Sequence, residues 1–267
     1  MRRYLWRDEA LMQRASPFLL VDYHPPFVYP RTSYRRGLPP HPHRGIDTVT
    51  LAFSGTLEAE DVRGERCRTG PGDVAWLSAG RGVVHEEFHA ADFSRAGGTL
   101  EMLQLWINRP AARKMDAPTQ RIVAAHAIPQ AVSASGAATI RVIAGTYAGL
   151  RGAYYPDGPV GIVDCTLAAG GEVVIACGDR ETVIALIIAG RVALDDGNVA
   201  GDGSLVFGER ARGTEVLRAC AGGAHVVVVR GTPIGEPIVR DGPFVMTDAD
   251  AIRHAHADYK SGRLGTS

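Results

Sequence analysis

The sequence lacks the features that mark an exported, membrane-bound or nucleic-acid-binding protein. Lys plus Arg and Asp plus Glu both number 29, so the formal net charge is zero and no basic surface is expected to attract nucleic acid or anionic lipid. The strongest hydrophobic run, residues 182–190, is too short to cross a bilayer, and residues 1–14 contain no apolar stretch of signal-peptide length. We therefore expect a cytoplasmic protein that binds neither membranes nor nucleic acid directly.

Cysteine is scarce, and its spacing excludes one common class of metal site. The four cysteines, Cys67, Cys165, Cys177 and Cys220, lie far apart and form no CxxC pair. This argues against a structural zinc site built from thiolates, and without an export signal we expect buried free thiols. The sequence also lacks a phosphate-binding glycine loop, a nucleophile elbow and a Ser-His-Asp arrangement.

Short strands and tight turns dominate what is present. The 32 glycines and 16 prolines separate brief apolar segments such as residues 47–55 and 99–110, which is typical of an all-β protein. Amphipathic helical spacing is nearly absent until residues 248–264, where it follows Asp248, a favourable N-cap residue. We therefore expect one short helix near the C-terminus.

An internal similarity predicts two related β domains. LAFSGTLEAED at residues 51–61 resembles LIIAGRVALDD at residues 186–196, and each is followed by a glycine turn and another strand. Copies so far apart indicate a duplicated domain rather than a solenoid. We expect an N-terminal domain of residues 1–113, a linker of residues 114–138 and a C-terminal domain of residues 139–267, with each domain a small antiparallel barrel or sandwich.

Four residues of the first domain form the strongest candidate site. His41 and His43 are two residues apart in HPHRG, where the prolines favour an extended backbone. His85 and Glu87 have the same spacing in VVHEE, at the end of another expected strand. Because residues i and i+2 of a strand point to the same side, two adjacent strands would bring three imidazoles and one carboxylate together. This set of donors suits iron, manganese, nickel, copper or zinc.

Either pair alone would be weak evidence, since most such histidines are ordinary surface or loop residues. The two pairs occur within one β domain and are separated by a glycine-rich hairpin, and this combination favours metal binding. Four protein ligands on an octahedral ion would leave two positions for substrate or O2. His89 is expected to be a surface or loop histidine, and Glu86 to point away from Glu87. Trp76 and Phe53 are left out of the site, because core packing explains them at least as well.

These motifs resemble those of the pirin family in the cupin superfamily. The similar stretches are HPHRGIDTVT (41–50), GPGDVAWLSAGRGVVHEE (70–87), LQLWINRP (103–110) and GEPIVRDGPFVMTDADAI (235–252). The resemblance implies a bicupin fold, with two antiparallel jelly-roll-type β-barrels and a short C-terminal helix. It also implies one metal ion, usually Fe(II), held in the first barrel by His41, His43, His85 and Glu87.

The resemblance is uneven around the site and in the second domain. The second barrel of pirins is typically metal-free, and the body of the second domain here has one histidine, His225, in an apolar strand. In the first domain, Ile46 and Asp47 replace a phenylalanine and a glutamate of the usual pattern. Ala59 replaces a histidine and Ala75 a glutamine, and these small side chains would widen the barrel mouth if they face inward.

The resemblance leaves alternative functions open. Pirins have been associated with quercetin 2,3-dioxygenase activity, which opens a flavonol ring with O2, and Glu87 would then be the base that removes the substrate's 3-hydroxyl proton. Some pirins instead regulate a protein partner, with iron as a redox-sensing group. In a third reading, quercetin turnover is incidental and the native substrate is another molecule. A deep, partly apolar pocket at the metal would favour an enzyme, and a closed site with an exposed patch elsewhere would favour a regulator.

Overall fold

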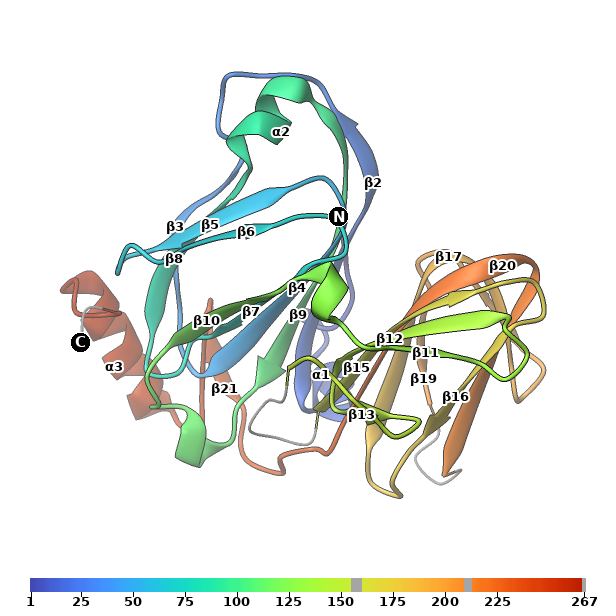
Figure 1. Cartoon of the computed structure of the whole chain (residues 1–267). Helices are drawn as coiled ribbons and strands as arrows, with labels where there is room; N and C mark the ends of the chain where they lie inside the picture. The colour runs from blue at the N-terminus through green and yellow to red at the C-terminus, as the bar shows by residue number, and fades with distance from the viewer. Residues whose placement is uncertain (155–159, 209–212, 266–267) are drawn as a thin grey trace. The chain divides into compact units, whose positions relative to one another are not determined.

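A computed structural model describes residues 1–154, 160–208 and 213–265 of the chain, which is built almost entirely of strands (Figure 1). The chain forms two compact units, and neither is a continuous segment. The first unit contains residues 1–6, 18–125 and 234–267, and the second contains residues 7–17 and 126–233. All four cysteines are free, as expected, and two of them are buried.

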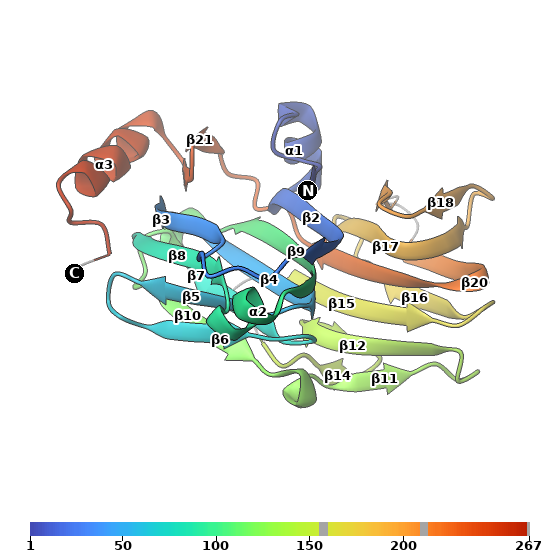
Figure 2. The ribbon, with the colours of Figure 1, turned by 90° about the horizontal axis from the view of Figure 1, so that it is seen from above.

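Two large antiparallel sheets form most of the first unit (Figure 2). Their strands are β1 (Arg2–Arg3), β2 (Phe18–Tyr29), β3 (Gly37–His43), β4 (Ile46–Ser54), β5 (Leu57–Asp61), β6 (Arg66–Thr69), β7 (Val74–Ser78), β8 (Val83–His89), β9 (Gly98–Asn108) and β10 (Thr119–Val123). The larger sheet has the order β1-β2-β9-β4-β7-β10, and the smaller has the order β3-β8-β5-β6. Side chains of both sheets line the same internal spaces, so the unit is a two-sheet sandwich.

Alternation along β9 shows how the larger sheet supplies both a core and a pocket. Leu103, Leu105 and Ile107 are buried on one face of the sheet. Gln104 and Trp106 point to the other face and line the pocket described below. Because successive side chains of a strand point to opposite faces, one strand can contribute residues to the core on one face and to the pocket on the other.

The C-terminal helix α3 (Ala249–Lys260) belongs to the first unit, whereas the sequence placed it in the second domain. As expected, it begins after Asp248, whose side chain accepts a hydrogen bond from the Ala251 amide. An apolar cluster joins the helix to the hairpin of β21 (Val239–Asp241) and β22 (Phe244–Met246). Its buried members are Phe244, Met246, Ile252, Ala255 and Leu264.

The difference in placement comes from contacts between residues distant in sequence. Arg44, next to the HPH motif, donates a hydrogen bond from Nη2 to Asp258 Oδ2 at 2.8 Å, and Arg44 is itself buried. Such pairing joins the chain's last segment to the first unit. α3 has 12 residues and is the longest described helix, and no described helix has the length and apolar character that crossing a membrane requires.

The second unit contains one eight-stranded antiparallel sheet. Its strands are β11 (Gln130–Val132), β12 (Ala138–Ala144), β15 (Val160–Leu167), β16 (Glu172–Ala176), β17 (Thr182–Leu194), β18 (Val199–Gly201), β19 (Leu205–Phe207) and β20 (Thr214–Gly231). The order is β11-β12-β15-β20-β17-β18, with β16 paired to β20 and β19 to β17. The helix α1 (Glu9–Ala15) and the hairpin of β13 (Thr146–Tyr147) and β14 (Leu150–Arg151) complete it. Its core is aliphatic, with Ile140, Ile187 and Val226 almost fully buried.

The fold class is therefore the expected one: an all-β bicupin with a short C-terminal helix. The described strands form open sheets rather than completely closed barrels. Residues 114–138, expected to be a linker, contain β10 and β11, and the two units meet in sequence within that segment, after Ala125. The two similar segments also differ in shape, because residues 51–61 turn at Gly55 into a second strand whereas residues 186–196 lie largely within the single strand β17.

Candidate metal centre

The strand β3 carries His41 and His43 at the edge of the smaller sheet. Three of its seven residues are prolines, which lack an amide hydrogen and are tolerated where one side of a strand has no partner. β3 pairs antiparallel with β8, and the Cα of His41 lies opposite that of His85. This register places the HxH pair directly beside the HxE pair, which is the arrangement that strand geometry predicted.

A glycine allows the two strands to approach at the site. Gly37 has a φ of 154°, and a Cβ at this position would lie 2.1 Å from the backbone oxygen of Glu87. A side chain there would force β3 away from β8. Gly37 therefore contributes to the position of the histidines on β3, although it contributes no donor atom.

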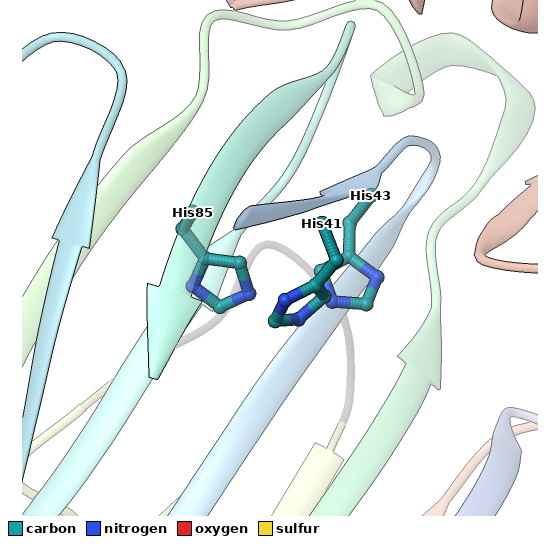
Figure 3. Close-up of side chains that lie close together, drawn as sticks. All are labelled: His41, His43 and His85. Atoms are coloured by element: carbon teal, nitrogen blue, oxygen red, sulfur yellow. The ribbon is translucent and has the colours of Figure 1, made fainter. Parts of the chain in front are cut away.

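The three imidazoles face one another (Figure 3). Ring centroids are 4.5 Å apart for His41 and His85, 5.0 Å for His41 and His43, and 5.2 Å for His43 and His85. One ring nitrogen of each lies within 4.8 Å of the other two. Since a metal–nitrogen bond is about 2.1 Å long, these separations are close to what one shared ion requires.

Glu87 adds a carboxylate to this group. Its Oε2 lies 3.8 Å from His41 Nε2 and 4.0 Å from His85 Nε2. Gln104 on β9 donates from Nε2 to Glu87 Oε1 at 3.3 Å and lies within 3.3 Å of Thr50 Oγ1. Gln104, which sequence reasoning missed, therefore holds the carboxylate toward the histidines. Its position two residues before Trp106 in LQLW, on an alternating strand, was a usable signal.

The protonation states of the imidazoles suit metal binding. His41 Nδ1 lies 2.9 Å from the carbonyl oxygen of Pro39, which can only accept, so Nδ1 donates and Nε2 is the nitrogen that faces Glu87. Burial lowers the pKa of His85, and lowers that of His43 well below its usual range, with the neighbouring histidines adding to the effect at His43. Neutral imidazole is the form that binds a metal.

Two ring nitrogens of the group, His43 Nδ1 and His85 Nε2, are buried without a hydrogen-bond partner among the described residues. His85 Nε2 lies 4.0 Å from a carboxylate oxygen of Glu87. An unpaired buried nitrogen is costly, and a bound cation would satisfy it together with Glu87. The side chains present therefore fit a divalent metal ion, and the chemistry of the donors includes no thiolate.

A pocket of about 440 Å³ opens on the His41 and Glu87 side of the group. The side chains of these two residues are 25% and 20% exposed, whereas that of His85 is 3% exposed. Apolar residues such as Leu57, Met102 and Trp106 form much of its wall. The volume and the mixture of apolar walls with few polar groups are typical of a small-molecule site.

His89 differs from expectation, since it is a pocket residue rather than a surface or loop histidine. It is 7% exposed, and its ring contacts the rings of Tyr29 and Phe93 edge-on, at centroid distances of 4.6 and 5.4 Å. It lies on β8 two residues after Glu87, so strand alternation already placed it on the same face. His24 on β2 also lines the pocket and was not predicted.

Ala59 and Ala75 lie beside the candidate ligands but do not widen the main pocket. They line a separate cavity of about 20 Å³ that is also bordered by His85 and Glu87. Such a volume holds roughly one water molecule. The small side chains therefore leave only a small space next to the site, rather than the larger mouth that was expected.

Three further positions behave as structural residues. Asp47, one of the departures from the pirin pattern, is buried and accepts hydrogen bonds from Trp76 Nε1 at 3.1 Å and from Arg109 Nη1 at 2.7 Å. Trp76 is 1% exposed and belongs to the core, so leaving it out of the site agrees with its position. Glu86 forms an ion pair with Arg35 at 2.9 Å, away from the three histidines.

Comparison with known proteins connects both units to one family. The family described as Pirin matches residues 1–107, and the Pirin C-terminal cupin domain matches residues 162–265. A Pseudomonas aeruginosa protein named "Putative quercetin 2,3-dioxygenase" is 36% identical over 262 residues, which cover 98% of this chain and 91% of the relative. Human Pirin is 30% identical over 269 residues, covering 99% of this chain and 87% of the relative.

A solved structure supports the same relationship. The crystal structure titled as Quercetin 2,3-dioxygenase from Acinetobacter baumannii superimposes with a TM-score of 0.93 at 34% identity. The match covers 98% of this chain and 91% of that one. The similarity therefore extends through both units rather than being confined to the histidine motifs.

Proposed function

This chain belongs to the pirin family, and we propose that it is a metal-dependent dioxygenase that opens the ring of a flavonol such as quercetin with O2. The observation that carries the proposal is the partly apolar pocket of about 440 Å³ that reaches the histidine group and Glu87. A regulator that only senses the state of its metal needs no such space. The names of the Pseudomonas and Acinetobacter relatives support the same activity.

We propose that His41, His43, His85 and Glu87 hold one divalent ion. Fe(II) is the first candidate, and manganese, nickel, copper and zinc are alternatives, because imidazole and carboxylate donors suit all of them. When bound, the ion supplies Lewis-acid and redox chemistry at the inner end of the pocket. The chain's own contribution is to hold three imidazoles in one cluster, two of them buried, and to keep the His41 side accessible.

Glu87 is the proposed base. Its carboxylate faces both the histidines and the pocket, and Gln104 holds it in place by a hydrogen bond at 3.3 Å. From there it accepts the proton of the flavonol 3-hydroxyl, and the electron-rich anion then reacts with O2. The ring opens, both atoms of O2 enter the product, and one ring carbon leaves as carbon monoxide. Met102 and Trp106 would pack against the flat rings and exclude water.

The test is metal analysis of the purified protein, followed by anaerobic reconstitution with Fe(II) and measurement of quercetin-dependent O2 uptake and carbon monoxide release. We expect one ion per chain and stoichiometric carbon monoxide. Glu87→Gln should lower the rate at least roughly 100-fold in chains that retain metal. Glu86→Gln is the matched control, because Glu86 pairs with Arg35 away from the pocket, and it should leave the rate unchanged.

The other outcomes separate the alternatives. A bound ion without O2 uptake would overturn the flavonol dioxygenase and favour either a regulator of a protein partner or a different native substrate. A wild-type chain that binds no metal after reconstitution would remove the basis of the site itself.

A further inference from the structure

The pocket is arranged in layers along its strands. On β8, His85, Glu87 and His89 follow one another at intervals of two residues and share one face. On β9, Gln104 contacts Glu87, and the next pocket residue, Met102, lies opposite His24 on β2. At about 3.4 Å per residue, His24 and His89 therefore lie one step of roughly 7 Å beyond the Glu87 layer.

The two outer histidines have unused hydrogen-bonding capacity. Within residues 1–154, 160–208 and 213–265, the ring of His89 forms no hydrogen bond, and its Nδ1 is buried without a partner. The side chain of His24 likewise forms none with the described residues, and both rings line the pocket. Edge-on contacts of His89 with Tyr29 and Phe93 hold its ring in one orientation. Because both rings line the pocket and form no hydrogen bond within the described residues, they are available to polar groups of a bound ligand.

Arg36 adds a cation beside these histidines. Its Nη1 donates to the carbonyl oxygen of Pro30 at 2.7 Å, and its guanidinium carbon lies 5.5 Å from the centroid of the Tyr29 ring. Its backbone oxygen accepts a hydrogen bond from the His89 amide at 2.7 Å. Arg36 also lines the pocket, so the outer end presents donors with a positive charge, whereas the walls between the ends are largely apolar.

We propose that this outer end selects substrates by their ring hydroxyls: His24, His89 and Arg36 bind hydroxyl groups on a flanking ring of a planar polyphenol whose reacting hydroxyl lies at Glu87. The proposal rests on the function proposed above and defines its substrate class. The step of roughly 7 Å between the layers is of the order of the distance from the 3-hydroxyl of a flavonol to the hydroxyls of its outer rings. The apolar wall between the two ends suits the flat ring system that joins them.

Two flavonols provide the test, because quercetin carries hydroxyls on both flanking rings and 3-hydroxyflavone has the same 3-hydroxyl and 4-carbonyl but no flanking hydroxyl. Dissociation constants are measured by tryptophan fluorescence quenching, with metal-free protein and with anaerobic metal-loaded protein. We expect wild type to bind quercetin roughly tenfold more tightly than 3-hydroxyflavone, as for one or two neutral hydrogen bonds. His89→Phe and His24→Phe should each remove most of this preference while leaving 3-hydroxyflavone binding unchanged.

His89→Phe keeps the aromatic contacts with Tyr29 and Phe93 and removes only the ring nitrogens. If it fails to fold, as judged by circular dichroism, His24→Phe and Arg36→Met decide the question. His254→Phe is the control, because His254 is exposed on α3 outside the pocket.

Each result has one meaning. Loss of the preference in the pocket variants but not in His254→Phe supports the proposal. Variants that keep the wild-type preference overturn it, as does a wild type that binds both flavonols equally. Tight and selective quercetin binding without turnover would contradict the dioxygenase and leave the selection of ring hydroxyls intact.

Discussion

The two units contain pockets of comparable size and different chemistry. The pocket of the first unit, about 440 Å³, is lined by two of the three clustered histidines, His41 and His43, and by Glu87. The pocket of the second unit, about 550 Å³, is lined in its described part by small and aliphatic residues with Tyr147 and Arg230, and by no histidine or carboxylate. Volume therefore does not distinguish a candidate metal centre from an ordinary cavity. The distinguishing feature is that adjacent strands bring donor atoms together through their register.

His225 of the second unit shows the same contrast. His225 Nε2 lies 2.6 Å from Asp164 Oδ1, and Arg141 donates to the other oxygen of that carboxylate at 2.7 Å. Its ring is thus engaged in a charged network across neighbouring strands. Among the described residues, three side chains close enough to share an ion occur only in the first unit. The first unit thus gathers three imidazoles, whereas in the second unit His225 is paired with a carboxylate.

Substitution of one histidine in each unit is the most direct test of this difference between the units. His43→Ala should abolish stable metal binding, from one ion per chain to near zero, because the two remaining imidazoles and Glu87 leave the buried side of the site open. His225→Ala should retain the full ion. Plasma mass spectrometry measures the metal content of both variants after reconstitution and dialysis. The comparison fails if His225→Ala releases the metal or if His43→Ala keeps it.

Shortening a core side chain of the second unit tests whether that unit contributes to stability but not to metal binding. Ile140 is 1% exposed within its aliphatic core, so Ile140→Ala should lower the free energy of unfolding by roughly 2–5 kcal/mol. Metal content under native conditions should not change. Urea unfolding followed by circular dichroism measures the loss, and Val174→Ala, at a position that is 43% exposed, is the control with a much smaller effect. Loss of metal from folded Ile140→Ala would show that the two units are coupled.

A buried lysine gives the first unit a pH dependence of its own. Lys114 is 2% exposed, and its Nζ donates to Gly45 O, Asn108 Oδ1 and Val245 O, while burial lowers its pKa to about 7. An unfolded lysine has a pKa of about 10.4, so between these values the unfolded chain binds more protons. The free energy of unfolding of wild type relative to Lys114→Met should therefore rise with pH across this interval, by on the order of 4 kcal/mol.

Urea unfolding of both proteins from pH 6 to pH 10 measures this difference. Below about pH 7 the lysine is protonated in both states, and the difference should be constant. A difference that stays flat throughout would mean that the three oxygen acceptors keep the ammonium charged in spite of its burial.

The smallest expected effect is on metal affinity, when the hydrogen bond that holds the Glu87 carboxylate is removed. Gln104→Leu removes the donor to the carboxylate and should weaken metal binding roughly tenfold, the lower end of the range for residues that orient a ligand. Competition with a chromophoric chelator measures the affinity. Gln13→Leu, on an exposed position of α1 in the second unit, should leave it unchanged. Equal affinities for Gln104→Leu and wild type would show that the histidines alone position Glu87.

Much of the site was predictable because it depends on local rules. The alternation of side chains along β3 and β8 selected His41, His43, His85 and Glu87. In the structure the three histidines cluster, and Glu87 lies 3.8 and 4.0 Å from two of them, His41 and His85. The same rule would have selected His89, which was instead assigned to the surface. Gln104 and His24 were not predicted, because they meet the site through pairings of β9 with β2 and β4 that no short motif reveals.

The sequence by itself determined the strands, the cap of the C-terminal helix and the two histidine-bearing motifs, since each depends on residues within a few positions of one another. The tertiary structure alone decided which segments form each unit, and it assigned α3 to the first through the Arg44–Asp258 pair and a buried apolar cluster. It also decided that His24, His89 and Arg36 share one pocket. The physical reason is that strand register and burial arise from contacts between distant residues, whose energies no local pattern encodes.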